Sequence, residues 1–134
     1  MNLLLDTHVL IWALNEDARL SEKARELILD PDHVIYYSSI SIWEVAVKHA
    51  RHPDNVTFTG KELSQYCQEA GLLPLELRDK HVYALETLTR AENAPAHHDP
   101  FDRMLIAQAK AENLSFLTHD SLLPAYNEKC IIPV

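Results

Sequence analysis

Short apolar runs and amphipathic segments alternate along the chain, and this alternation predicts strands separated by helices. Apolar runs of strand length cover residues 2–5, 34–38, 72–75, 115–118 and 130–133. Several of them are almost continuously apolar, as in LLL and SFL, which is typical of strands buried on both faces of a parallel sheet. The pattern therefore predicts the α/β class, with a central parallel β-sheet flanked by helices.

Helix start and stop signals fall between these runs. They predict helices over about residues 21–29, 41–49, 59–71, 79–89 and 99–112. Ser41-x-x-Glu44 and Thr59-x-x-Glu62 have the form of a capping box, in which two side chains satisfy backbone N–H groups at the start of a helix. Asp99 precedes a proline at the start of the last helix, where an aspartate caps and a proline fits the first helical position.

Composition narrows the possible functions. The chain has 134 residues, of which 47% are hydrophobic and 24% are charged, as in ordinary globular proteins. A chain of this length is expected to form one domain over residues 1–134. Its 2 glycines are too few for a G-x-G-x-x-G dinucleotide loop or a G-x-x-x-x-G-K-[ST] phosphate loop, so nucleotide binding of those kinds is excluded.

The cysteines and the apolar run near the N-terminus indicate the cellular compartment in which the protein is expected. Cys67 and Cys130 lie far apart and form no C-x-x-C pair. We therefore expect neither a disulfide framework nor a zinc knuckle, and a reducing, cytoplasmic compartment fits best. The apolar run over residues 2–14 is interrupted by an aspartate and a histidine and lacks a basic leader and a cleavage site, so we expect neither a signal peptide nor a membrane span.

The charge balance is acidic. Lys and Arg number 12 against 20 Asp and Glu, which gives a net charge of −8. This balance argues against a nucleic-acid binder held by a broad basic patch. Any contact with nucleic acid would have to be local and assisted by a cation.

Four acidic residues occupy related positions in the predicted sheet. Asp6 and Asp120 follow the first and fourth apolar runs, and Glu44 and Asp102 lie in the first turns of helices. Because parallel strands end at one edge of a sheet, where ligands bind in such folds, we expect these side chains to converge there. Ionised carboxylates so close together need a counter-charge, and Mg²⁺ or Mn²⁺ prefers oxygen ligands. The sequence thus predicts a divalent-cation site.

Each acid also has a purely structural interpretation. Glu44 is what a capping box with Ser41 requires, and Asp102 suits the positive end of its helix. An aspartate directly after a strand, as Asp6 and Asp120 are predicted to be, is common in turns. The joint pattern carries more weight than any single residue.

Four segments stand out together: LLLDTHVLIWAL from Leu3, SSISIWEVAVK from Ser38, HHDPFDRMLIAQA from His97 and LTHD from Leu117. They strongly resemble the PIN-domain ribonucleases of the VapC toxin family, in the family's order and over nearly the whole chain. Within them, D-P-F-D-R-x-L-I-A-Q-A is a specific signature. The resemblance implies a PIN-like three-layer fold, with a central parallel sheet flanked by helices.

The resemblance also implies roles for particular residues. Asp6, Glu44, Asp102 and Asp120 would be the catalytic, metal-binding acids. Asp99 would be a fifth acid, whose better role is to cap its helix and whose alternative role is contact with the metal or with a water. The family consists of toxins of type II toxin–antitoxin pairs that cleave RNA, often as homodimers. An antitoxin partner is therefore implied, in a toxin–antitoxin hetero-oligomer, with its C-terminal segment covering the acidic edge.

Three neighbours of the acids are candidates to contact substrate. Thr7 and Thr118 could position water or a carboxylate, although a threonine at a strand end often bonds its own backbone. Lys48 could lead RNA phosphates toward the metal. The competing interpretation of Lys48 is a surface ion pair with Glu44, four residues earlier.

Several histidines near the acids raise a zinc hypothesis. His97, His98 and His119 lie around the acidic positions, but none has the H-E-x-x-H spacing. We interpret His97 and His98 as residues of the site's edge that are able to touch RNA. His8 is interpreted as packing or orienting, and Trp12 as a core or interface anchor rather than a base-stacking platform.

The leading hypothesis is a Mg²⁺-dependent endoribonuclease in which a cation activates water for attack on a phosphodiester bond. A phosphoryl-accepting regulatory module is one alternative, because an aspartate after the first strand suits that chemistry. Against it, Asp6-Thr7-His8 lacks the second aspartate of a D-x-D motif. A catalytically silent PIN-like binding module is another alternative, although all four acids are present.

Overall fold

Five parallel strands form one sheet at the centre of the molecule. In the computed structural model, which describes residues 1–134, the strand order is β3-β2-β1-β4-β5. The strands are β1 (Asn2–Leu5), β2 (Val34–Ser38), β3 (Leu73–Leu75), β4 (Ser115–Thr118) and β5 (Ile131–Pro133). Every neighbouring pair is parallel, so the predicted α/β class with a central parallel sheet is confirmed.

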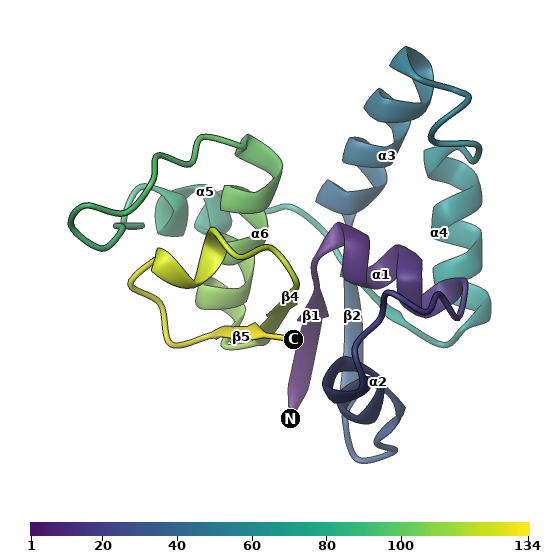
Figure 1. Cartoon of the computed structure of the whole chain (residues 1–134), viewed down its shortest axis with the longest axis horizontal. Coiled ribbons are helices and arrows are strands. Elements are labelled where there is room, and N and C mark those ends of the chain that lie inside the picture. The colour runs from purple at the N-terminus through teal and green to yellow at the C-terminus, as the bar shows by residue number, and fades with distance from the viewer.

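Helices connect the strands (Figure 1). They are α1 (Thr7–Leu14), α2 (Glu22–Leu29), α3 (Ser39–Arg51), α4 (Gly60–Glu69), α5 (Asp79–Leu85), α6 (Pro100–Glu112) and a short 3-10 helix, η1 (Leu123–Ala125). The longest, α3 and α6, have 13 residues each. None of the helices has the length and apolar character needed to cross a membrane.

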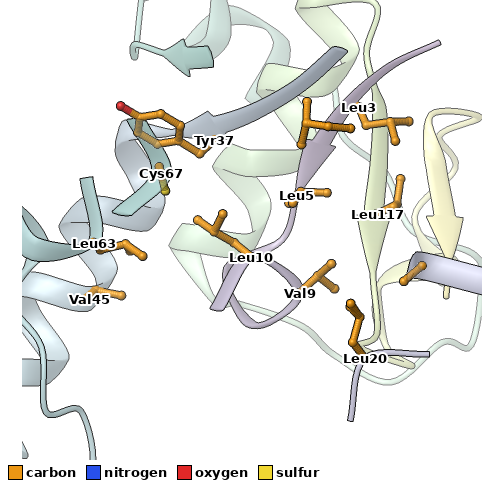
Figure 2. Packing of buried hydrophobic residues seen from close by; sticks show 12 residues of the cluster. Leu3, Leu5, Val9, Leu10, Leu20, Tyr37, Val45, Leu63, Cys67 and Leu117 are labelled. Carbon is orange, nitrogen blue, oxygen red and sulfur yellow. The ribbon is translucent and has the colours of Figure 1, made fainter. Parts of the chain in front are cut away.

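Helices cover both faces of the sheet, as a three-layer fold requires. The side chains of β1 alternate between two cores: Leu3 and Leu5 pack with residues of α1, α2, α3 and α4, whereas Leu4 packs with residues of α6 and η1. Figure 2 shows the first core, in which Leu10 of α1 packs near Leu5. Successive side chains of a strand point to opposite faces, so β1 is buried on both sides, as its apolar run predicts.

Most predicted elements are confirmed to within a residue or two. The bounds of β1, β2 and β4 are those predicted, and β3 and β5 each begin one residue later. The capping box of Thr59 and Glu62 is present, and Gly71 follows α4 with a φ of +81°. The helix predicted over residues 79–89 ends at Leu85 instead. Nothing in the sequence pattern predicts α1 or η1.

The capping box predicted for Ser41 and Glu44 is wrong. The N-cap of α3 is Ser38, whose Oγ accepts a hydrogen bond from the backbone N–H of Ile40 at 2.9 Å. Because β2 also ends at Ser38, the strand runs directly into the helix and the helix begins earlier than predicted. Ser41 and Glu44 therefore lie inside the helix, with their side chains available for contacts with other elements.

The strand order changes direction between β1 and β4. The chain adds β2 and β3 on one side of β1, and then β4 and β5 on the other. In the register, Leu5 at the end of β1 pairs with Leu117 of β4. Asp6 and Thr118 therefore leave the sheet side by side at its carboxyl edge, which is where open parallel sheets bind ligands.

Candidate active site at the carboxyl edge of the sheet

Asp6 is held at the point where the strand order changes. It is the N-cap of α1, and its Oδ1 accepts a hydrogen bond from the backbone N–H of Thr7 at 2.8 Å. Its Oδ2 accepts one from the Thr118 hydroxyl at 2.6 Å. Burial raises the pKa of Asp6, although these two hydrogen bonds act in the opposite direction. A buried carboxylate that accepts hydrogen bonds from two fixed donors has a fixed orientation, unlike a charged side chain on the surface.

The Thr118 hydroxyl links two of the acids. It donates to Asp6 and accepts a hydrogen bond from the backbone N–H of Asp120 at 3.0 Å. Asp120 is also tied to the loop after β4, because its Oδ1 accepts from the backbone N–H of Leu122 at 2.9 Å. Thr118 is buried and does not line the cavity formed by the acids. Its contacts are those of a residue that orients Asp6 and Asp120.

Glu44 reaches the same edge from α3. It is buried, and its Oε1 accepts a hydrogen bond from the Thr7 hydroxyl at 2.8 Å. The Ser41 Oγ lies 2.9 Å from the Thr7 Oγ1. Since a hydroxyl has one proton and that of Thr7 goes to Glu44, Ser41 donates to Thr7. Sequence reasoning missed this role of Ser41 because it assigned the residue to a helix cap.

Lys48 pairs with Glu44, as the competing interpretation of its spacing predicts. Burial lowers the pKa of Lys48, but the hydrogen bond and charge of Glu44, with the charges of Asp99 and Asp102, raise it overall. Lys48 also lines the cavity between the acids. Lys48 therefore both forms an ion pair with Glu44 and lines the cavity.

The start of α6 places two acids at different depths. Asp99 is exposed and is the N-cap, with its Oδ1 accepting a hydrogen bond from the backbone N–H of Asp102 at 3.0 Å. The predicted capping role of Asp99 is confirmed. Asp102 is only 17% exposed. Burial, followed by the charges of the four neighbouring carboxylates, raises the pKa of Asp102 to about 8.

These side chains surround one cavity of about 300 Å³. Its lining is Asp6, Thr7, His8, Trp12, Glu44, Lys48, Asp99, Asp102, His119 and Asp120. The lining thus has five carboxylates and a single lysine, and the charges of the other four carboxylates add to burial in raising the pKa of Asp102. An excess of oxygen donors and negative charge fits a hard divalent cation.

One edge of the cavity is aromatic. His8 stacks on Trp12 with ring centroids 5.9 Å apart, and His119 meets the edge of Trp12 at 5.3 Å. Arg19 lies over the Trp12 ring at 5.3 Å. Trp12 is half-buried and packs against the core, which agrees with its interpretation as an anchor, and His8 packs on it.

His97 is the residue that sequence reasoning placed wrongly. His98 is exposed, but His97 is buried, so it is not an edge residue. Its Nε2 lies 3.1 Å from the Asp102 Oδ2, and its Nδ1 lies 2.7 Å from the Tyr126 hydroxyl. Burial lowers the pKa of His97. No local signal shows this role, because Tyr126 is 29 residues away in the sequence.

Comparisons with known proteins agree with the fold. Residues 3–129 match the sequence model of a family described as PIN domain. The crystal structure of VapBC2 from Rickettsia felis, bound to a DNA fragment from the promoter, contains a similar chain with a TM-score of 0.65 and 16% identity, and the match covers 100% of this chain and 98% of that one. FitAcB from Neisseria gonorrhoeae gives a TM-score of 0.53 and 19% identity, with 89% and 88% covered. No curated protein matches significantly.

Proposed function

Because the chain belongs to the PIN domain family, we propose that it is a metal-dependent endoribonuclease, the toxin of a type II toxin–antitoxin pair. PIN domains are generally nucleases. The observation that carries the proposal is the convergence of Asp6, Glu44, Asp102 and Asp120 on one cavity at the point where the strand order changes. These residues come from four separate segments of the chain. No single structural role, such as capping a helix, therefore explains why all four acids lie at the same cavity.

The four acids would hold Mg²⁺, for which Mn²⁺ can substitute. When bound, a divalent cation supplies positive charge beside the scissile phosphate and activates water for in-line attack. The residues around the acids keep these ligands in place: Thr118 orients Asp6, and Thr7 orients Glu44. Pre-organised ligands lower the cost of binding a cation, because few side chains need to be reordered.

Lys48 is the proposed contact with the substrate. It is the only lysine or arginine of the cavity lining. Its present partner is Glu44, and a cation bound by Glu44 would release the ammonium group to bind an RNA phosphate. Such a local contact suits a protein with a net charge of −8, which cannot attract RNA through its overall charge.

The partner proposed for this chain is a cognate antitoxin. The similar chains of known structure come from toxin–antitoxin complexes, VapBC2 and FitAcB. An antitoxin segment that carries a basic residue would fit the acidic cavity by charge. We also propose a cytoplasmic location and a homodimer or toxin–antitoxin hetero-oligomer as the working assembly.

The test is cleavage of a structured RNA by the purified protein, with and without Mg²⁺ or Mn²⁺. We expect the wild type to cleave only with the cation and Asp6→Asn to lose cleavage, because the substitution removes a ligand charge and keeps the side-chain volume. Asp54→Asn is the matched control, since Asp54 is exposed and lies outside the cavity. Sequencing the 5′ ends of the products would identify the RNA and the cut site.

Two results would contradict the proposal in different ways. If Asp6→Asn keeps a native circular dichroism spectrum and cleaves as well as the wild type, Asp6 is not a catalytic ligand. If the wild type binds the cation but cleaves no RNA, the chain is a silent PIN-like binding module.

A further inference from the structure

Two acids of the cavity lining, Asp102 and Asp120, form a mixed nitrogen and oxygen cluster with the buried His97, which lies outside that lining. One ligand atom from each of His97, Asp102 and Asp120 lies within 4.8 Å of the other two. We infer that these three residues form a metal position that selects a first-row transition ion such as Mn²⁺ over Mg²⁺, with the His97 Nε2 as a ligand. This inference rests on the proposed function, because it concerns two of the same acids, Asp102 and Asp120, and it adds a nitrogen ligand and a metal preference.

His97 is built into the fold as a metal-binding histidine would be. It is 92% buried, with its Nε2 directed at Asp102. Its other ring nitrogen, Nδ1, lies 2.7 Å from the Tyr126 hydroxyl. Histidines that bind metals almost always use the second ring nitrogen in such a hydrogen bond, which fixes the orientation of the ring. The hydrogen-bond partner of His97 is thus in the position that metal binding requires.

Tyr126 is itself held firmly. It is 4% exposed, its ring meets the His97 ring edge-on at 5.5 Å, and the Arg90 guanidinium lies over it at 4.6 Å. The residues that orient His97 are therefore buried or packed, and its Nε2 has little freedom to turn away from the acids.

Neither carboxylate of this cluster has a lysine or arginine partner. Lys48, the lysine of the cavity lining, pairs with Glu44. Asp102 is in contact with His97, and Asp120 forms no ion pair with a lysine or arginine. A divalent cation bound here would therefore supply the positive charge that these two carboxylates lack.

The donor set determines which cation is preferred. Mg²⁺ favours sites made of oxygen atoms and keeps several of its waters. An imidazole nitrogen suits transition ions, whose affinity for nitrogen ligands is higher. Replacing one oxygen position by the His97 Nε2 therefore shifts the preference of this position from Mg²⁺ toward Mn²⁺.

Electron spin echo spectroscopy of the protein with Mn²⁺ alone tests the nitrogen ligand directly. We expect the wild-type spectrum to show modulation from a bound nitrogen, and we expect His97→Asn to lose it. His98→Asn and His119→Asn are the controls: His98 is exposed beside the site, and His119 lines the cavity. Both should retain the modulation, which would assign the nitrogen to His97.

Titration calorimetry gives a second readout. We expect His97→Asn to weaken Mn²⁺ binding at least roughly tenfold, and Mg²⁺ binding by less, so that the ratio of the two affinities falls. Tyr126→Phe keeps the ring but removes the hydroxyl that orients His97, and should weaken Mn²⁺ binding roughly tenfold.

The opposing results separate this inference from the proposed function. Wild-type protein that binds Mn²⁺ without nitrogen modulation would show that His97 only orients Asp102, while leaving the metal-dependent nuclease intact. Wild-type protein that binds no Mn²⁺ or Mg²⁺ would overturn both. If His97→Asn does not fold, ¹⁵N-histidine labelling of the wild type together with the His98 and His119 variants decides the assignment.

Discussion

A single hydroxyl, that of Thr118, joins the acids of two strand ends. It donates to the buried Asp6 and accepts from the backbone of Asp120. We expect Thr118→Val to destabilise the protein by about 1–3 kcal/mol, because a buried acceptor loses its donor. Thr118→Ser keeps the hydroxyl and should restore most of the stability. Urea unfolding of the three proteins measures the difference, and equal midpoints for Val and Ser would refute the role of the hydroxyl.

The protonation of Asp102 makes the stability of the metal-free protein depend on pH. Its pKa is about 8 in the folded state, against an ordinary value of 3.8. The folded state therefore binds this proton more tightly than the unfolded chain, and the resulting stability is present below pH 4 and is lost as the pH rises through about 8. In the presence of a chelator, we expect the urea midpoint of the wild type to fall over this range.

Asp102→Asn is the comparison for that measurement. It removes the titrating group, so its midpoint should fall less with pH, and at the alkaline end it should be more stable than the wild type because one repelling charge is gone. Parallel pH profiles for the two proteins would mean that Asp102 is not the responsible group.

At this scale, the sequence predicts which acids meet but not how they are held. Asp6 and Asp120 could be placed because each follows a strand of a parallel sheet, and strand ends share an edge. The contacts of His97 with Tyr126 and of Ser41 with Thr7 join residues 29 and 34 positions apart. Such contacts depend on how helices pack over the sheet, which local patterns do not specify.

In α6, the residue that caps the helix and the residue proposed to act in cleavage are different, so the two roles can be tested separately. Asp99 and Asp102 lie three residues apart and both line the cavity, but only Asp99 caps the helix. We expect Asp99→Ala to cost roughly 1 kcal/mol of stability, and Asp99→Ser to retain stability and most cleavage, because serine also caps. Asp102→Asn should stay folded and lose cleavage. Denaturant unfolding and RNA cleavage are measured on each variant, and an inactive, stable Asp99→Ser beside an active Asp102→Asn would reverse the two roles.

The elements differ in how well their sequences predict them. The apolar runs of β1, β2 and β4 give their bounds correctly because these strands are buried on both faces. The first helix is missed because the apolar run continues past Asp6 into α1 with no loop residues between. The start of α3 is misplaced for a related reason: Ser38 ends a strand and caps a helix at once, and two later residues imitate a capping box.

For the whole molecule, cation binding should appear as added stability. A ligand that binds only the folded state stabilises it, by about 2.7 kcal/mol at one hundred times its Kd. We expect Mg²⁺ or Mn²⁺ to raise the Tm of the wild type and of Asp54→Asn, and to raise that of Asp6→Asn much less. Thermal melts at several cation concentrations provide the measurement, and equal shifts in all three proteins would place the cation away from the acids.

The pairing of β1 with β4 brings together residues from the two ends of the chain. During synthesis, Asp6 and Glu44 leave the ribosome early, whereas Asp102 and Asp120 are among the last of the acids to be made. A nascent chain that has reached only α5 carries two of the four acids and lacks β4, the strand whose Thr118 orients Asp6. If the chain cuts RNA as proposed, the ribosome that synthesises it is not exposed to a complete active site until the codon for Asp120 has been translated.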